Sequence, residues 1–197
     1  MADTKKICII EGHPDPSPDR FSKALCHAYA EGAAKSGHEL KHIRICDLDY
    51  GFLSSKEDFA TEPPEVIRVE REKIAWADHL VIAFPLWLGS MPAKLRAFFE
   101  QAARADFFIT SSEDNKGWPT QLMKGKSARI LVSMGMPGLV YRFMMDEGAL
   151  KALERAMLGL SGFHPIRHDI LGNIDGMSDE DRQHWLDKVR HYGELAE

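Results

Sequence analysis

The chain has 197 residues, of which 44% are hydrophobic and 28% charged, and its formal net charge is −5. This composition is typical of a globular protein and excludes a disordered tail, and the length fits a single domain over residues 1–197. Because the charge has no basic excess, a surface for nucleic acid or for an anionic membrane is excluded as the main function.

Five short segments rich in β-branched residues are predicted to be strands. In chain order they cover residues 6–10, 40–46, 79–84, 129–134 and 166–171. Segments with helical periodicity follow them, over residues 20–36, 64–77, 92–104, 147–161 and 179–195. Five alternations of strand and helix predict an α/β domain with one parallel sheet and helices on both of its faces.

Local signals mark several ends of these helices. The first helix is followed by Ser36 and Gly37, a pair that suits a helix C-terminus. The third begins after Pro92, a residue favoured at the first helical position. The last follows Ser178, which is predicted to form a capping box with Asp181.

Two connections are long, residues 47–63 and residues 105–125. Loops of this length in a compact domain are often functional. The second contains three large aromatic residues, Phe107, Phe108 and Trp118. A short helix or a hairpin inside each connection is the simpler alternative.

Cysteine usage and the N-terminus bear on the compartment. Cys8, Cys26 and Cys46 are odd in number and lack metal-site spacing, which favours buried thiols in a reducing compartment. The apolar segment 7–10 is too short for a signal peptide, and no run approaches the roughly 18 apolar residues of a membrane helix. We therefore expect a cytoplasmic protein without membrane insertion, and its scattered histidines predict no metal site.

The position of a ligand site follows from the topology. In open parallel sheets, ligands bind beyond the carboxyl ends of the strands where the strand order reverses. In the common order 2-1-3-4-5 this point lies between strands one and three. The candidate loops therefore follow the first, third and fourth strands and cover residues 11–22, 84–94 and 133–141.

The first loop ends at the start of a helix. Free N–H groups and the positive end of the helix dipole favour a phosphate there. Arg20 adds a charge, Ser22 a hydroxyl and His13 a ring donor. The loop lacks the glycines and the lysine of a Walker A motif, and the alternative is a Pro-rich turn in which Asp19 caps the helix.

The second and third loops combine apolar residues with glycine. In the second, a flat apolar ligand would rest against Trp87 and Leu88, unless both residues belong to the core. In the third, Gly135 and Gly138 permit close approach of the backbone to a ligand, and Tyr141 adds a hydroxyl. Three such loops at the three required positions are a stronger signal than any one of them.

These residues carry a family resemblance over nearly the whole chain. Residues 84–99, FPLWLGSMPAKLRAFF, are similar to the pattern FPLWWGSMPAILKGWF of the flavodoxin-like NAD(P)H:quinone oxidoreductases, the DT-diaphorase type with its shorter bacterial relatives. The run His13-Pro-Asp-Pro followed by Phe21-Ser22 resembles the opening pattern of that family. The resemblance implies a flavodoxin-like three-layer fold with a five-stranded parallel sheet of order 2-1-3-4-5.

The resemblance also implies which residues hold a flavin. The phosphate and ribityl chain would be held by His13, Phe21 and Ser22, to which Arg20 adds a charge. The isoalloxazine ring would be lined by Pro85, Leu86, Trp87 and Leu88. The other side of the ring would be flanked by Ser133, Met134, Gly135 and Met136. Tyr141 falls where the family often has a tyrosine that contacts substrate and reduced flavin, so it is the candidate catalytic residue, with ordinary packing at a helix start as the alternative.

The implied activity is that of an NAD(P)H dehydrogenase that transfers two electrons to a quinone or a similar flat acceptor. FMN is favoured over FAD because the chain is shorter than the FAD-binding members, and the electron donor is NADH or NADPH. Three residues depart from the family pattern: Ser22 for Asn, Met136 for Gly, and Glu147 for a histidine found in some members. These departures leave the acceptor and any proton donor open.

The resemblance further implies a homodimer with the active site at its interface. Phe107, Phe108 and Trp118 would then close the pocket, with a satellite core as the alternative. Other functions remain open: a flavodoxin-type carrier of single electrons, an ancillary flavoprotein of a membrane transporter, or a reductase of azo or nitro compounds. The modest charge of −5 argues against the strongly acidic carrier.

Overall fold

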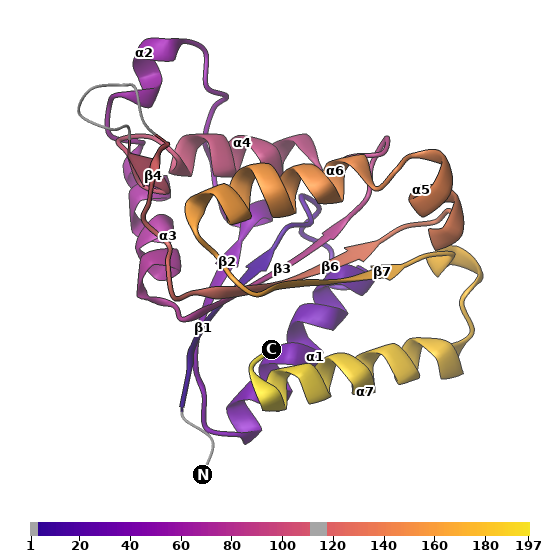
Figure 1. The fold of residues 1–197 in the computed structure, drawn as a ribbon. Helices are drawn as coiled ribbons and strands as arrows, with labels where there is room; N and C mark the ends of the chain where they lie inside the picture. Colours follow the sequence, from indigo (N-terminus) through magenta and orange to yellow (C-terminus); the bar gives the residue numbers. More distant parts are fainter. Residues whose placement is uncertain (1–3, 111–117) are drawn as a thin grey trace.

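A computed structural model describes residues 4–110 and 118–197, and one five-stranded sheet organises them (Figure 1). Its strands are β1 (Lys6–Glu11), β2 (Glu39–Arg44), β3 (His79–Pro85), β6 (Ser127–Ser133) and β7 (Ile166–Leu171). All neighbours are parallel, and the order is β2-β1-β3-β6-β7. Counted along the chain, this is the predicted order 2-1-3-4-5.

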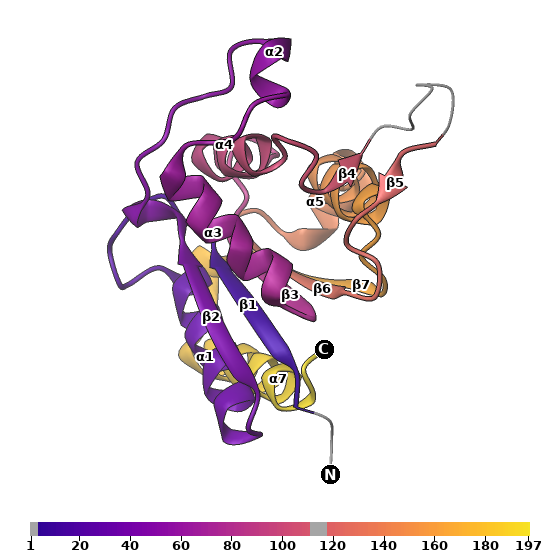
Figure 2. The same cartoon turned by 90° about the vertical axis from the view of Figure 1, so that its left-hand side faces the viewer.

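Helices cover both faces of this sheet, which confirms the three-layer prediction (Figures 1 and 2). One face carries α1 (Phe21–Lys35) and α7 (Asp179–Leu195). The other carries α3 (Glu65–Trp76), α4 (Ala93–Ala102) and a continuous helix formed by α6 (Gly148–Lys151) and the π-helical segment η2 (Ala152–Gly159). The five predicted helices are therefore all present.

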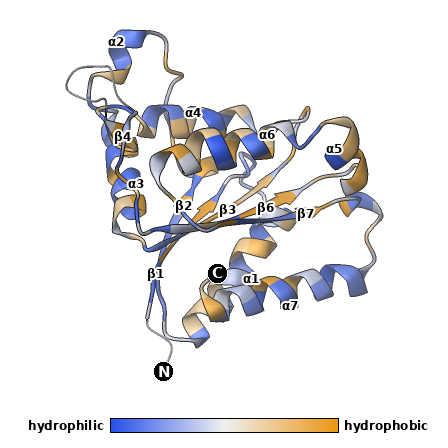
Figure 3. Cartoon of the chain, viewed as in Figure 1, coloured by the Kyte–Doolittle hydropathy of each residue, from blue (hydrophilic) through white to orange (hydrophobic). Residues whose placement is uncertain are grey.

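Side-chain alternation along the strands builds the two halves of the core. In β1, Ile7 and Ile9 pack toward α1 and α7, whereas Cys8 and Ile10 pack toward α3 and α4. The central strands therefore contribute side chains to both core clusters, and their ribbons are largely in the hydrophobic colour in Figure 3. Burial raises the pKa of the Cys8 thiol to about 12, so this cysteine is a small core residue, as expected.

The two helices on one face approach each other through glycines. A Cβ atom added at Gly32 of α1 would overlap the main-chain oxygen of Arg190, and one at Gly193 of α7 would overlap that of Tyr29. The backbones of α1 and α7 are thus in direct contact. Because the two helices are packed so closely, the position of α7 is set by that of α1. The first residues of α7 then lie near the carboxyl ends of the strands.

Both long connections contain short elements, so the simpler alternative is confirmed. The first contains the short helix α2 (Lys56–Phe59), and the 3₁₀ turn η1 (Ile45–Asp47) leads into it at the end of the predicted second strand. The second contains a hairpin of β4 (Ile109–Thr110) and β5 (Thr120–Gln121). Phe108 is buried in the core with Phe107 packed against it, whereas Trp118 is exposed, so the three aromatic residues do not form one cluster.

Sequence periodicity missed two further elements, the helix α5 (Gly138–Met144) and the 3₁₀ turn η3 (Ile174–Gly176). The predicted capping box before α7 is half formed. The hydroxyl of Ser178 accepts the N–H of Asp181 at 3.1 Å and donates to its carboxylate at 2.7 Å. No described helix is both long enough and apolar enough to cross a membrane.

A buried histidine lies at the opposite edge of the sheet from the predicted site. His79 is 2% exposed, its Nδ1 lies 2.7 Å from the hydroxyl of Ser127, and its Nε2 has no hydrogen-bond partner among the described residues. Burial lowers its pKa to about 3. Positively charged or titratable neighbours lower it further, namely Lys5, Arg129, Arg167 and His38.

This histidine predicts acid sensitivity. Because His79 stays neutral in the folded chain and takes up a proton near pH 6.5 when unfolded, the free energy of unfolding falls as pH drops from about 6 to 4. The contribution is about 1.4 kcal/mol per pH unit. Denaturant titrations at several pH values should show a shallower fall for His79→Gln than for the wild type. Parallel curves would contradict the buried neutral state.

Candidate functional site

The loops after β1, β3 and β6 converge at the carboxyl edge of the sheet. They line a cleft of about 290 Å³ together with the segment that follows β7. Its lining includes the predicted residues His13, Arg20, Phe21, Ser22, Pro85, Trp87 and Ser133. It also includes Asp19 and three residues that the sequence did not suggest, Ile174, Asp175 and Arg182.

The start of α1 faces this cleft without a cap. Arg20 is the N-cap residue, and within residues 4–110 and 118–197 no side chain caps the helix, so the alternative role for Asp19 is wrong. The Arg20 guanidinium instead pairs with Asp15, with its Nε donating at 2.8 Å. A hydrogen bond from the backbone N–H of Ser17, followed by the pairing with Arg20, lowers the pKa of Asp15. The free N–H groups of the helix start therefore remain available for an anion.

Ser22 brings a buried hydroxyl to this helix start. Its side chain is 3% exposed, and its Oγ has no hydrogen-bond partner in the part of the chain that the structure describes. An unpaired buried hydroxyl is costly in a native protein. A ligand oxygen in the cleft would accept a hydrogen bond from the Ser22 hydroxyl and so remove the cost of burying it unpaired.

His13 adds a neutral ring donor. Its Nδ1 accepts the backbone N–H of Asp15 at 3.0 Å, and burial followed by the charge of Arg20 lowers its pKa. The neutral tautomer that accepts at Nδ1 carries its hydrogen on Nε2. The ring packs edge to face on Trp87, with centroids 5.6 Å apart, so His13 joins the first loop to the second.

Arg182 reaches the cleft from α7. Its guanidinium lies 5.3 Å over the ring of Phe21 and donates to the main-chain oxygens of Ile174 and Met177. The charge is thus held beside the start of α1. Arg182 lies outside the three candidate loops, and its local signal in the sequence is that it follows three acidic residues as the first basic residue of that helix.

The turn after β3 presents its apolar side chains to solvent. Trp87 and Ser90 exchange backbone hydrogen bonds of 2.8 and 2.9 Å, and Leu88 and Gly89 between them both have positive φ, as in a type I′ turn. Trp87 is 47% exposed and Leu88 fully exposed, so the alternative that both are core residues is wrong. The N–H of Leu86 is bonded to the oxygen of Ser133, whereas that of Leu88 has no partner among the described residues.

The loop after β6 is held by the segment after β7. The N–H of Met134 donates to the oxygen of Leu171 at 2.9 Å, and the oxygen of Met136 accepts from Asn173 at 2.9 Å. A Cβ atom at Gly135 would lie 2.6 Å from Oδ2 of Asp175, so a larger residue there would displace this carboxylate. Of the predicted residues in this loop, Ser133 lines the cleft, and Met134 is buried below it.

The side chain of Tyr141 lies in the core and not at the surface of the cleft. It is fully buried, and its hydroxyl accepts the backbone N–H of Leu150 at 3.2 Å, at the start of α6. Burial raises the pKa of its phenol. Glu147 accepts a hydrogen bond from Nε of Arg142 at 2.8 Å. The catalytic role of Tyr141 stays a prediction, and in this conformation its hydroxyl stabilises a helix start.

Tyr141→Phe separates the two roles. We expect the variant to lose about 1–2 kcal/mol of unfolding free energy, because the N–H of Leu150 then lacks its buried acceptor. Flavin reduction by NADH should stay within about twofold of wild type. Denaturation and stopped-flow absorbance measure the two effects. Unchanged stability with a large loss of reduction rate would restore the catalytic assignment.

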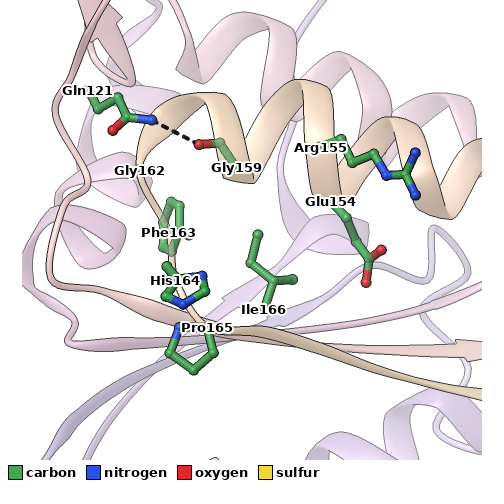
Figure 4. A pocket seen from close by; sticks show the side chains of 9 residues that line it. All are labelled: Gln121, Glu154, Arg155, Gly159, Gly162, Phe163, His164, Pro165 and Ile166. Atoms are coloured by element: carbon green, nitrogen blue, oxygen red, sulfur yellow. Dashed lines mark hydrogen bonds between the residues drawn. The ribbon is translucent and has the colours of Figure 1, made fainter.

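A further cavity, of about 440 Å³, lies away from this cleft (Figure 4). It lies beside the end of η2 and the beginning of β7, and Gln121, Glu154 and His164 are among its lining residues. Two of its polar side chains already have protein partners: Gln121 donates to the oxygen of Gly159, and Glu154 lies 2.5 Å from Nδ1 of His168. Within the described residues, no group of three or more His, Cys, Asp or Glu is arranged to hold a metal ion.

Known proteins resemble the chain over most of its length. An uncharacterized NAD(P)H oxidoreductase of Haemophilus influenzae is 22% identical, over 89% of this chain and 87% of that protein. An FMN-dependent NADH:quinone oxidoreductase of Macrococcus caseolyticus is 27% identical, over 66% of this chain and 69% of that protein. The crystal structure of an FMN-dependent NADH-azoreductase from Bacillus anthracis in complex with FMN has a TM-score of 0.76 at 17% identity, over 98% of this chain and 100% of that one. A family model described as flavodoxin-like fold matches residues 5–194, and the chain belongs to this family.

Proposed function

We propose that the chain is a flavin-dependent NAD(P)H oxidoreductase that passes two electrons to a quinone or a similar flat acceptor. The observation that carries this proposal is the convergence of three loops on one cleft with phosphate donors at one end and exposed apolar side chains at the other. The relatives named above as NAD(P)H and quinone oxidoreductases support it.

The donors at the start of α1 fit a flavin phosphate. The unpaired hydroxyl of Ser22 and the uncapped N–H groups would donate to its oxygens. Nε2 of His13 would add a neutral donor, and Arg20 and Arg182 two charges. FMN is the proposed cofactor, in keeping with the FMN-dependent relatives, and mass spectrometry of the released chromophore distinguishes it from FAD.

The turn after β3 fits the flavin ring. When bound, the isoalloxazine ring supplies the hydride chemistry, while the chain supplies binding, orientation and electrostatics. Trp87 and Leu88 would offer the ring an apolar surface, and the free N–H of Leu88 a donor for its polar edge. Donor and acceptor would occupy the same space above the ring in turn, which requires an open apolar slot.

A homodimer would complete this slot. Leu139, Phe143 and Met144 of α5 are all exposed, and Met145 lies beside Gly89 in the turn after β3. Exposed apolar residues clustered beside a cleft are typical of an interface. We propose that a second copy of the chain covers this surface, which sedimentation of the holoprotein would test.

The decisive experiment is anaerobic reduction. The protein reconstituted with FMN is mixed with NADH or NADPH, and loss of flavin absorbance is expected, followed by its return on addition of a quinone. Parallel additions of azo and nitro compounds rank the acceptors. No bleaching by either nucleotide would overturn the proposal, and stepwise one-electron reduction would favour an electron carrier.

A further inference from the structure

The segment after β7 brings a carboxylate into the cleft. This carboxylate forms no hydrogen bond with the groups that are expected to bind the phosphate. Asp175 of η3 lines the cleft together with Ser133 and Arg182. In residues 4–110 and 118–197 its carboxylate has neither a hydrogen-bond donor nor an ion-pair partner. Arg182 is engaged by the main-chain oxygens of Ile174 and Met177 instead.

Backbone hydrogen bonds hold the segment that carries this exposed carboxylate against the third loop. The N–H of Ile174 donates to the oxygen of Met134 at 3.1 Å, and that of Asn173 to the oxygen of Met136 at 2.9 Å. Asn173 adopts a left-handed φ of 57°, which turns the chain back over the third loop. Asp175 is therefore anchored to the loop after β6, directly over Gly135.

The place of Asp175 in the cleft argues for a hydroxyl ligand. A carboxylate repels phosphate, and the cationic group of this segment, Arg182, lies on the Phe21 side, next to the start of α1. Asp175 lies on the Gly135 side, against the loop expected to flank the ring, and it lines the same cleft as the residues of the phosphate end. A carboxylate with unfilled acceptor positions binds neighbouring hydroxyls through charge-assisted hydrogen bonds.

We propose that Asp175 accepts hydrogen bonds from the hydroxyls of the flavin's ribityl chain and so positions the ring between the second and third loops. This inference rests on the proposed function, because it requires a flavin in the cleft. It adds a fourth loop to the site and assigns a role to a residue outside the family's patterns quoted above. Gly135 is then explained as the position that leaves room for this carboxylate.

Three flavins test this assignment in the full chain. Lumiflavin lacks the ribityl chain, riboflavin has it without phosphate, and FMN has both. Dissociation constants are measured by fluorescence quenching for the wild type and for Asp175→Ala. The variant should bind riboflavin and FMN about tenfold more weakly, by the same factor, and lumiflavin equally well. Asp175→Asn, which keeps one carbonyl acceptor, should recover part of the loss.

Asp19→Ala is the matched control, because it removes the same charge from the same cleft on the phosphate side. It should leave riboflavin binding unchanged. Equal riboflavin binding by wild type and Asp175→Ala would overturn the assignment of Asp175 alone. Tighter binding of FMN but not riboflavin by Asp175→Ala would overturn it as well, because the carboxylate would then only repel phosphate. A wild-type chain that binds none of the three flavins would overturn the proposed function together with this inference.

Discussion

Ser22→Asp should bind FMN at least about 100-fold more weakly than the wild type, while its affinity for riboflavin changes little. The hydroxyl of Ser22 is buried, unpaired and directed to the start of α1, where the phosphate of FMN is expected. A carboxylate there repels the phosphate by about 4 kcal/mol at a separation near 4 Å and an effective dielectric constant of 20. It would also occupy the free N–H groups of the helix start.

Titration calorimetry with FMN and riboflavin measures this effect, because riboflavin differs only in lacking the phosphate. Ser22→Ala should lose only one charge-assisted hydrogen bond, which corresponds to roughly tenfold weaker FMN binding. The control is Ser36→Asp, which adds the same charge at the C-terminal end of the same helix. Equal FMN binding by Ser22→Asp and wild type would place the phosphate elsewhere.

The sequence was sufficient to predict the sheet and the loops that line the candidate cleft. The predicted strand segments are rich in β-branched residues, and the central strands β1, β3 and β6 are buried. Strand alternates with helix five times, which leaves few topologies. Ligands bind where the strand order reverses, and this rule points to the loops that contain His13, Ser22 and Trp87. These three residues do line one cleft. Local composition and a general rule of topology were enough for this part.

The features that the sequence does not predict depend on contacts between distant residues or on short helices. Helix α5 spans seven residues, too few to show a period, so the sequence leaves Tyr141 between contact with the ligand and ordinary packing at a helix start, and the structure buries its side chain. Arg182 reaches the cleft because α7 packs on α1, about 160 residues earlier in the chain, and Asp175 reaches it because its segment is hydrogen-bonded to the loop after β6. Nothing in the sequence near Arg182 shows that contact.

The packing of α7 on α1 makes Gly193 a position of large effect. We expect Gly193→Ala to lower the free energy of unfolding by about 3 kcal/mol or more. Alanine at an ordinary helical position would stabilise the chain by up to about 1 kcal/mol relative to glycine, so the expected sign is opposite to helix propensity. The added Cβ would overlap the main-chain oxygen of Tyr29 and lie 2.9 Å from the nitrogen of Ala33. Both are backbone atoms of α1, which cannot move without separating the helices.

Gly148→Ala is the matched control, because this glycine also lies in a helix and a Cβ there would have no described atom within 4 Å. Its stability in denaturant titration should equal or slightly exceed that of the wild type. Because α7 carries Arg182, Gly193→Ala should also weaken FMN binding under conditions where the variant remains folded. A Gly193→Ala protein as stable as Gly148→Ala would show that α1 and α7 separate at little cost. The position of Arg182 over Phe21 would then not be fixed by the packing of these helices.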